Sequence, residues 1–185
     1  MAKLHFGMMQ SLDGYVDDLA GTLVMPPPGA VLFRTFVDHV SALGGIIYGR
    51  RMYEVMRYWD DDQAKEQNWD AAERDFAAAW RAAPKWVASR TLKTVGPNAT
   101  LIEGDVVAAV RKLKAEIDGD IEVAGPEIAG VLAAANLIDE YRMFYRGFVL
   151  GQGKPFFAAA RPPLRITATA MVEDAVMVTC VPLSE

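Results

Sequence analysis

Hydrophobic residues recur at two different periods along this chain, and these periods mark its first elements. Leu4, Phe6 and Met8 are two residues apart, which predicts a strand with one face turned to the core. Residues 11–30 contain a cluster of glycines and prolines that excludes a continuous helix or an interior strand. We interpret this stretch as a long loop, a kind that is usually functional, with a mobile surface segment as the alternative.

Helical spacing and short apolar runs alternate through the middle of the chain. Helices are predicted over residues 32–43, from residue 50, and over about 69–82, 106–117 and 126–135. Strands are predicted between them at residues 46–49, 85–89 and 120–125. Asp105 is the predicted N-cap of one helix, and Pro126 suits the first turn of another. This alternation is typical of crossover connections around a mainly parallel sheet.

The end of the chain has a different pattern. RITATAMV and AVMVTCV are two β-rich runs separated by Glu173 and Asp174, and they predict an antiparallel hairpin added to the sheet. Elsewhere there is no repeat, no low-complexity tract and no shift in composition that would mark a linker. We therefore expect one domain over residues 1–185.

Composition and charge narrow the class of protein. The 185 residues are 52% hydrophobic and 23% charged, as in ordinary globular chains. With 19 basic and 24 acidic residues the net charge is −5, which argues against a nucleic-acid partner. One cysteine and two histidines are too few for a structural zinc site, so no metal is expected. Without a leader peptide or an apolar run of about 18 residues, we expect a cytoplasmic protein with no membrane contact.

Chemistry in a parallel sheet is expected where strands end and helices begin. At residues 49–51 (Gly-Arg-Arg), a glycine admits a ligand and two guanidinium groups suit an anion, unless both arginines are simply solvated. At residues 124–126 (Ala-Gly-Pro), small residues before a helix start suit a phosphate, or mark only a good helix start. Residues 89–91 (Ser-Arg-Thr) suit a ribose or its 2′-phosphate, or form an ordinary capped turn.

Other polar positions give weaker signals. Residues 151–153 (Gly-Gln-Gly) are flexible enough to approach a ligand but equally suit a plain loop. His5 and His39 are assigned structural roles because no serine or cysteine nucleophile signature lies near them. The aspartates at 60–62 favour a hydrated turn over a metal site because no pattern of oxygen ligands surrounds them.

Five segments, taken in order, resemble one family. They are SLDGY at 11–15, IIYGRRMYE at 46–54, KWVASRTL at 85–92, DIEVAGPEIAGVLAAANLIDEY at 120–141 and VLGQGKPFF at 149–157. Together they resemble the reductase domain of the bacterial riboflavin-biosynthesis deaminase-reductases, over nearly the whole chain. The resemblance implies an α/β, dihydrofolate reductase-like fold. Its central sheet would be mixed, mostly parallel and of about eight strands, flanked by helices and ending in an antiparallel hairpin.

The resemblance also implies a site for NADPH and assigns its residues. The residues expected to contact the cofactor are Met9, Gly49, Arg50, Arg51, Met52, Ser89, Arg90, Ala124, Gly125, Pro126, Glu127 and Ile128. Among them, residues 49–51 would meet the 2′-phosphate and pyrophosphate, and residues 124–127 the pyrophosphate. Ser11 and Asp13 are the expected catalytic residues beside the nicotinamide, with Asp13 orienting the substrate or a proton-delivering water.

Several positions depart from the family's pattern. Phe33 stands near the position of the substrate-binding acid of dihydrofolate reductases. Gly7 and Val123 replace a lysine and an acid of the riboflavin-pathway reductases, and Met52 replaces a threonine. The Asp-Asp-Pro segment of those enzymes is missing here, and Arg146 with Gly147 replaces a proline. The cofactor half of the pattern is thus better preserved than the substrate half, which indicates a changed substrate.

The leading hypothesis is an NADPH-dependent oxidoreductase that reduces a small pterin-, pyrimidine- or aminouracil-like substrate. It would resemble 5-amino-6-(5-phosphoribosylamino)uracil reductase and, as the resemblance implies, form a homodimer. The alternatives are a non-catalytic nucleotide- or ligand-binding homodimer of the same fold and a self-associating scaffold without nucleotide affinity.

Overall fold

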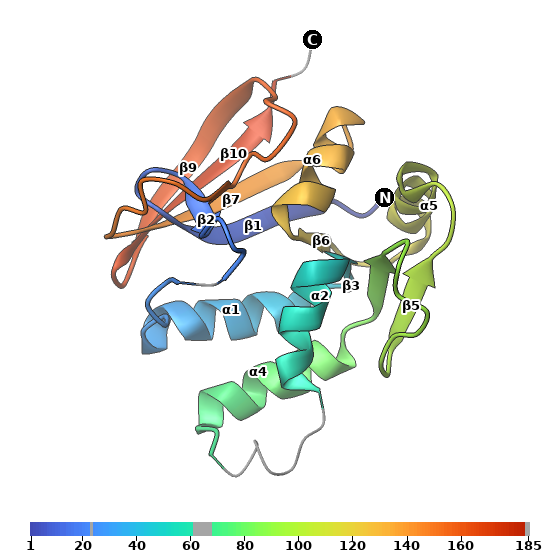
Figure 1. The fold of residues 1–185 in the computed structure, drawn as a ribbon, viewed down its shortest axis with the longest axis horizontal. Coiled ribbons are helices and arrows are strands. Elements are labelled where there is room, and N and C mark those ends of the chain that lie inside the picture. The colour runs from blue at the N-terminus through green and yellow to red at the C-terminus, as the bar shows by residue number, and fades with distance from the viewer. Residues whose placement is uncertain (23, 61–67, 184–185) are drawn as a thin grey trace.

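An eight-stranded sheet organises the structure, a computed structural model that describes residues 1–22, 24–60 and 68–183 (Figure 1). From edge to edge its strands are β5 (Ala99–Ile102), β4 (Lys85–Ala88), β3 (Gly45–Gly49), β6 (Ile121–Ala124), β1 (Leu4–Ser11), β7 (Glu140–Arg146), β10 (Ala175–Pro182) and β9 (Leu164–Val172). Neighbours from β5 to β7 are parallel, whereas β10 runs antiparallel to both β7 and β9. The predicted mixed, mostly parallel sheet with a C-terminal hairpin is confirmed.

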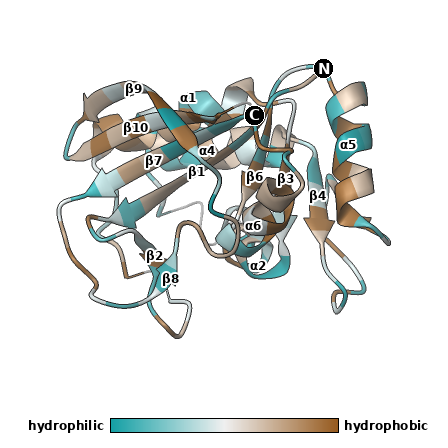
Figure 2. Ribbon diagram, turned by 90° about the horizontal axis from the view of Figure 1, so that it is seen from above, coloured by the Kyte–Doolittle hydropathy of each residue, from teal (hydrophilic) through white to brown (hydrophobic). Residues whose placement is uncertain are grey.

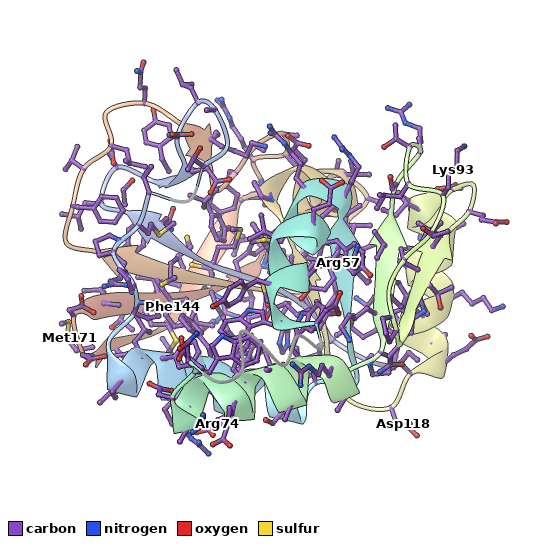
Figure 3. All side chains as sticks on the ribbon, turned by 60° about the horizontal axis from the view of Figure 1, so that its bottom comes forward. Arg57, Arg74, Lys93, Asp118, Phe144 and Met171 are labelled. Atoms are coloured by element: carbon purple, nitrogen blue, oxygen red, sulfur yellow. The ribbon has the colours of Figure 1, made fainter. Side chains whose placement is uncertain are left out.

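Helices cover both faces of this sheet. α1 (Ala30–Ala42) and α4 (Ala71–Ala82) pack on one face, and α5 (Val106–Glu116) and α6 (Pro126–Ala134) pack on the other. α2 (Arg50–Met56) follows β3 directly and continues into the short 3-10 helix η1 (Arg57–Trp59). Figure 2 shows brown, hydrophobic stretches along the central strands, between these helical layers. On the side of the sheet covered by α1, the ring of Phe144 of β7 packs against the ring of Phe36 of α1. The two ring centroids are 5.1 Å apart, and Figure 3 labels Phe144.

Local signals explain where three of the helices begin. The Asp70 carboxylate accepts a hydrogen bond from the Glu73 amide at 2.8 Å, and Glu73 accepts one in return, which forms a capping box before α4. Asp105 accepts hydrogen bonds from the first amides of α5, as predicted. Pro126 occupies the first turn of α6, where its missing N–H costs nothing.

β1 departs from the prediction that only one of its faces turns to the core. Leu4 and Phe6 are 0% and 1% exposed on the face covered by α5 and α6, as expected. His5, on the opposite face, is also buried, because α1 covers that side and brings the His39 ring within 6.5 Å. A central strand of a sheet covered on both sides is buried on both faces.

Residues 11–30 contain a short strand that the cluster of glycines and prolines did not predict. β2 (Tyr15–Asp17) lies within this segment and pairs antiparallel with β8 (Lys154–Pro155). Further along, the buried Arg146 guanidinium donates hydrogen bonds to the carbonyls of Pro26 and Pro27, each at 3.3 Å. The segment is thus tied to the sheet, and the prediction of an unstructured loop is wrong for residues 15–17.

The described residues also bear on three expectations, which concern the aspartates at 60–62, a membrane span and a metal site. Asp60 accepts a hydrogen bond from Arg57 at 2.8 Å, whereas Asp61 and Asp62 lie outside the described residues. In the part of the chain that the structure describes, no helix has the length and apolar character needed to cross a bilayer. The same residues contain no group of three or more His, Cys, Asp or Glu side chains that could hold a metal ion.

Candidate functional site

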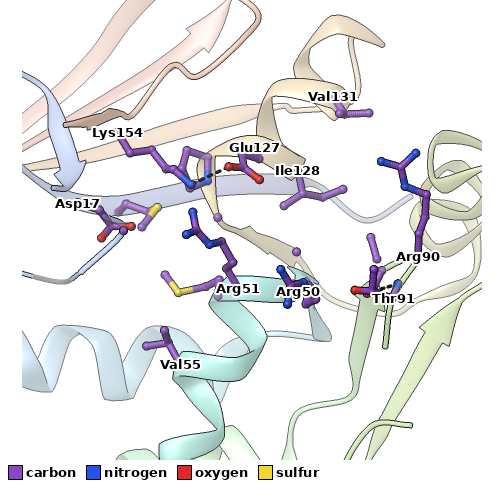
Figure 4. Close-up of a pocket in the computed structure, with 18 residues that line it drawn as sticks. Asp17, Arg50, Arg51, Val55, Arg90, Thr91, Glu127, Ile128, Val131 and Lys154 are labelled. Carbon is purple, nitrogen blue, oxygen red and sulfur yellow. Dashed lines mark hydrogen bonds and ion pairs between the residues drawn. The ribbon is translucent and has the colours of Figure 1, made fainter. Parts of the chain in front are cut away.

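A cavity of about 490 Å³ lies where β3, β4 and β6 end and the next segments begin (Figure 4). Its volume falls within the range of small-molecule sites. The residues that line it are Met8, Asp17, Gly21, Gly49, Arg50, Arg51, Met52, Val55, Ala88, Ser89, Arg90, Thr91, Gly125, Pro126, Glu127, Ile128, Val131 and Lys154. The three junctions selected from the sequence therefore open into one cavity.

The β3–α2 junction supplies guanidinium groups. Arg50 and Arg51 are the first residues of α2, and both line the cavity. Arg50 contacts Glu54 at 3.4 Å, but both side chains are nearly half exposed, so this ion pair is weak and leaves Arg50 available to a ligand. α2 has only seven residues, so the expected contribution of its dipole is small, and the positive charge of this wall comes from the side chains.

The β6–α6 junction brings backbone close to the cavity. Gly125 has φ 113° and ψ 131°, which residues with a Cβ rarely adopt, and a Cβ built there would lie 3.4 Å from the Met52 Cβ. No side chain in the described part of the chain caps the first turn of α6. This wall therefore combines a glycine with an uncapped helix start, an arrangement that suits an anion.

Glu127 and Lys154 form an ion pair across the cavity wall. The Lys154 ammonium donates a hydrogen bond to the Glu127 carboxylate at 2.7 Å, from β8 to the first turn of α6 (Figure 4). This hydrogen bond is the main reason that the pKa of Glu127 lies below its usual value. The Lys154 side chain is 18% exposed, whereas that of Glu127 is 70% exposed. Lys154 can therefore exchange a solvent-facing carboxylate for a ligand phosphate at little cost.

The turn after β4 satisfies both interpretations of residues 89–91. The Ser89 hydroxyl accepts hydrogen bonds from the amides of Thr91 at 3.2 Å and Leu92 at 3.0 Å, which is a capped turn. Ser89, Arg90 and Thr91 nevertheless all line the cavity, at the end opposite Asp17 and Lys154 (Figure 4). The turn thus holds the Arg90 guanidinium at the far end of the site.

Four of the predicted site residues do not line the cavity. Met9 lies on the face of β1 opposite to Met8, where its sulfur accepts a hydrogen bond from Arg146 at 3.5 Å. Met8 takes the expected place instead, because successive side chains of a strand point to opposite faces. Ala124 is 8% exposed and packs with the core beside α1 and α4.

Ser11 and Asp13 shape a neighbouring turn rather than the cavity. Ser11 is fully buried and its hydroxyl accepts a hydrogen bond from the Tyr15 amide at 3.0 Å. Its single proton has two acceptors in reach, the Tyr15 carbonyl at 3.3 Å and the Asp13 carboxylate. The exposed Asp13 carboxylate also accepts hydrogen bonds from the amides of Leu150 and Gly151. The hydrogen bond from Ser11, then these amides, lowers the pKa of Asp13, so it remains ionised and anchors the loop before β8.

Sequence reasoning did not find Asp17 and Lys154, which line the end of the cavity nearest β1. The pairing of β2 with β8 places the two residues opposite each other, although 136 other residues lie between them in the chain. Lys154 directly follows the Gly-Gln-Gly segment, so a signal was present for that residue. Nothing in the sequence distinguishes Asp17 from its neighbour Asp18.

The sheet order and the helices on both faces define a dihydrofolate reductase-like α/β protein. The chain belongs to the family of the RibD C-terminal domain, which matches residues 2–177. The family is reductase-like, and membership of it supports the interpretation that this protein is an enzyme. The uncharacterized protein YyaP of Bacillus subtilis (strain 168) is 27% identical over 159 residues, covering 84% of this chain and 80% of YyaP.

Several solved structures share this fold. A putative riboflavin biosynthesis protein from Shewanella sp. PV-4 superposes with a TM-score of 0.72 at 21% identity, over the whole of both chains. A pyrimidine reductase-like protein from Corynebacterium diphtheriae gives 0.69 at 9% identity, covering 100% of this chain and 93% of that one. A Thermotoga maritima deaminase and 5-amino-6-(5-phosphoribosylamino)uracil reductase gives 0.67 at 13% identity, and 98% of this chain covers 57% of that protein.

Proposed function

We propose that this protein is an NADPH-dependent reductase that transfers a hydride to a small pterin-, pyrimidine- or aminouracil-like substrate. One observation carries the proposal. The cavity is lined by most of the residues that the family resemblance assigns to the cofactor, drawn from three separate strand ends. These residues leave an open volume of about 490 Å³ rather than filling the junctions with their own side chains.

The chemistry of the lining fits a phosphorylated dinucleotide. Arg50, Arg51 and Arg90 supply planar guanidinium groups, which bind phosphates through paired hydrogen bonds, and Lys154 supplies an ammonium group. In this proposal Arg50 and Arg90 bind the 2′-phosphate, and Arg51 and Lys154 bind the pyrophosphate. Bound NADPH would supply the hydride, while the protein's own residues orient the two reactants and exclude water.

The packing around the family's substrate positions supports a changed substrate. Phe33 lies in an aromatic cluster, with its ring 5.5 Å from Phe76 and 6.3 Å from Trp59. Val123 is fully buried, and a Cβ at Gly7 would contact Arg142 at 3.5 Å. Val123 lies in the packed interior, and Phe33 and Gly7 are half-buried against other side chains, so polar groups for the family substrates would need partners there. Folate reduction is therefore not proposed.

Titration with NADPH, followed by fluorescence or calorimetry, tests the proposal. We expect micromolar binding, weakened about 10-fold in Arg50→Ala because one charged phosphate contact is lost. Arg111→Ala is the matched control, since Arg111 is an exposed residue of α5 outside the cavity lining. No binding at millimolar NADPH rejects the proposal. Binding without NADPH oxidation across pterins, aminouracils and quinones would instead favour the non-catalytic binding protein.

We further propose that two copies of the chain associate through β9. This strand is last in the sheet order and pairs, among the described strands, with β10 alone. Its Ile166 and Met171 side chains are 64% and 69% exposed, and a long apolar edge strand readily pairs with another strand. Light scattering of the wild-type protein should give a mass of twice 20.3 kDa. The double variant Ile166→Lys, Met171→Lys should give the mass of the monomer. A monomeric wild-type protein at micromolar concentration rejects the dimer.

A further inference from the structure

The carboxyl group of Asp17 occupies the end of the cavity nearest β1. Asp17 is the last residue of β2, and it lines the cavity together with Met8 and Lys154 (Figure 4). The close pairing of β2 with β8 fixes its position, since a Cβ at Gly153 would lie 2.1 Å from the Asp17 carbonyl oxygen. At the opposite end lie Arg90 and Thr91, the groups assigned above to the adenosine side.

One oxygen of this carboxyl group has no hydrogen-bond partner within the described part of the chain. The Asp17 Oδ1 atom is buried and accepts no hydrogen bond from any residue that the structure describes. An ionised carboxylate in that position would lose water without compensation, whereas a protonated carboxyl loses much less. Burial is accordingly the main cause that raises the pKa of Asp17 above its usual value.

Charged groups on neighbouring elements surround Asp17 and affect whether its carboxyl group is protonated or ionised. Lys154 on β8 and Arg51 on α2 lower its pKa, and Asp18, which directly follows β2, raises it. Glu127 on α6 lies beyond Lys154 and holds that ammonium through the 2.7 Å ion pair. Arg51 also donates a hydrogen bond to the Ala20 carbonyl at 3.5 Å, in the segment that follows Asp17. The two cations that favour the ionised form of Asp17 are thus the two assigned to the pyrophosphate.

Resting on the proposed function, we propose that Asp17 is the proton donor of this site and takes up its proton when the dinucleotide binds. Phosphate groups neutralise Arg51 and Lys154 and add negative charge near Asp17, and both effects favour the protonated carboxyl. Binding of the reductant therefore prepares the acid.

In the proposed reduction, the hydride and the proton add to two different atoms of the substrate. Bound NADPH would supply a hydride, with its electron pair, to the electrophilic carbon of a C=N, C=C or C=O group of the substrate. The π electrons of that group would move to its other atom, which would take the proton from the Asp17 carboxyl. The products would be NADP⁺ and the reduced substrate, and the Asp17 carboxylate would regain its proton from solvent when the next NADPH binds.

The other carboxyl groups near the cavity do not fit this role. The pKa of Glu127 starts below its usual value, so losing Lys154 to a phosphate leaves it ionised near neutral pH. The pKa of Asp13 is also lowered, and Asp13 lies outside the cavity lining. The Asp18 carboxylate accepts a hydrogen bond from the Thr22 amide at 2.8 Å and is not part of the lining.

Proton uptake during NADPH binding tests the proposal without requiring the substrate. Calorimetric titration at about pH 6, in two buffers that differ in ionisation enthalpy, gives the number of protons bound per NADPH. The wild-type protein should take up a substantial fraction of one proton, and Asp17→Asn should bind NADPH with that uptake lost. Glu116→Gln is the matched control, because this exposed residue ends α5, outside the cavity lining.

Other outcomes overturn the proposal. Unchanged uptake in Asp17→Asn, or uptake lost in Asp13→Asn instead, would assign the proton to another group. Infrared difference spectra of the wild-type protein give a second readout, since NADPH binding should create the carbonyl band of a protonated carboxyl. If that band fails to form when NADPH binds, the proposal is wrong even where the variant does not fold. A wild-type protein that binds no NADPH would reject the proposed function itself, a distinct result.

Discussion

Replacing Arg146 should cost more stability than replacing any exposed arginine. Arg146 is 3% exposed at the end of β7, where its guanidinium joins three parts of the chain. It donates hydrogen bonds to the carbonyls of Pro26 and Pro27 at 3.3 Å and to the Asp174 carboxylate at 2.7 Å. Arg146→Met keeps the length of the side chain but leaves these acceptors without their donor.

The magnitude follows from the burial of the two ends of this contact. Breaking a buried ion pair by removing one partner typically costs about 3–5 kcal/mol. Asp174 is 57% exposed and can be rehydrated, and the Arg146 Nε already lacks a hydrogen-bond partner among the described residues. We therefore expect the lower end, about 3 kcal/mol, which lowers the melting temperature by roughly 6–12 °C in a chain of this size.

Urea titration and thermal melting of Arg146→Met and Arg161→Met measure this effect. Arg161 is exposed and should change stability by no more than about 0.5 kcal/mol. A loss below about 1 kcal/mol in Arg146→Met would refute the argument that this guanidinium holds residues 26–27 to the sheet. Asp174→Asn should cost only about 1 kcal/mol, because an amide oxygen can still accept one hydrogen bond.

Three further predictions test other parts of the structure. Asp70→Ala removes the capping box with Glu73 and should cost about 1 kcal/mol of unfolding free energy, whereas Asp70→Asn should cost less. Burial lowers the pKa of Lys85 from 10.5 to about 8, so the unfolded chain binds more protons between these values. Stability should therefore rise with pH across that window, by at most roughly 3 kcal/mol, and Lys85→Met should flatten the rise in urea titrations. Gly125→Ala should cost about 1–3 kcal/mol because φ is 113°, and Gly147→Ala, with open space around it, is its control.

Local signals predicted most helices and most of the strands between them, although not β5. α4 and α5 begin where Asp70 and Asp105 cap them, and an N-cap acts within a few residues of its position in the sequence. β7 was not predicted, because both of its faces are covered. Its sequence therefore does not alternate between buried apolar residues and exposed polar residues. Arg142 on β7 is instead satisfied by Glu140, at 2.6 Å, within the packed layer. Such pairing is a tertiary effect that hydrophobic period alone does not show.

The candidate site was predicted in part for a geometric reason. Parallel strands end at one edge of a sheet, so the junctions after β3, β4 and β6 had to lie near one another. The alternation along β1 was predicted correctly, but the family resemblance assigned Met9 to the cofactor, and its side chain lies on the face opposite Met8. Asp17 and Lys154 come together through the pairing of β2 with β8, a contact between distant segments, and only Lys154, which follows Gly-Gln-Gly, had a local signal.

The proposed function requires that the cavity after β3, β4 and β6 hold a phosphorylated dinucleotide. A crystal structure of the protein soaked with NADPH would show whether it does. We expect electron density for the dinucleotide along this cavity, with the 2′-phosphate beside Arg50 and Arg90 and the pyrophosphate beside Arg51 and Lys154. Density for NADPH at another surface, with this cavity holding only water, would contradict it.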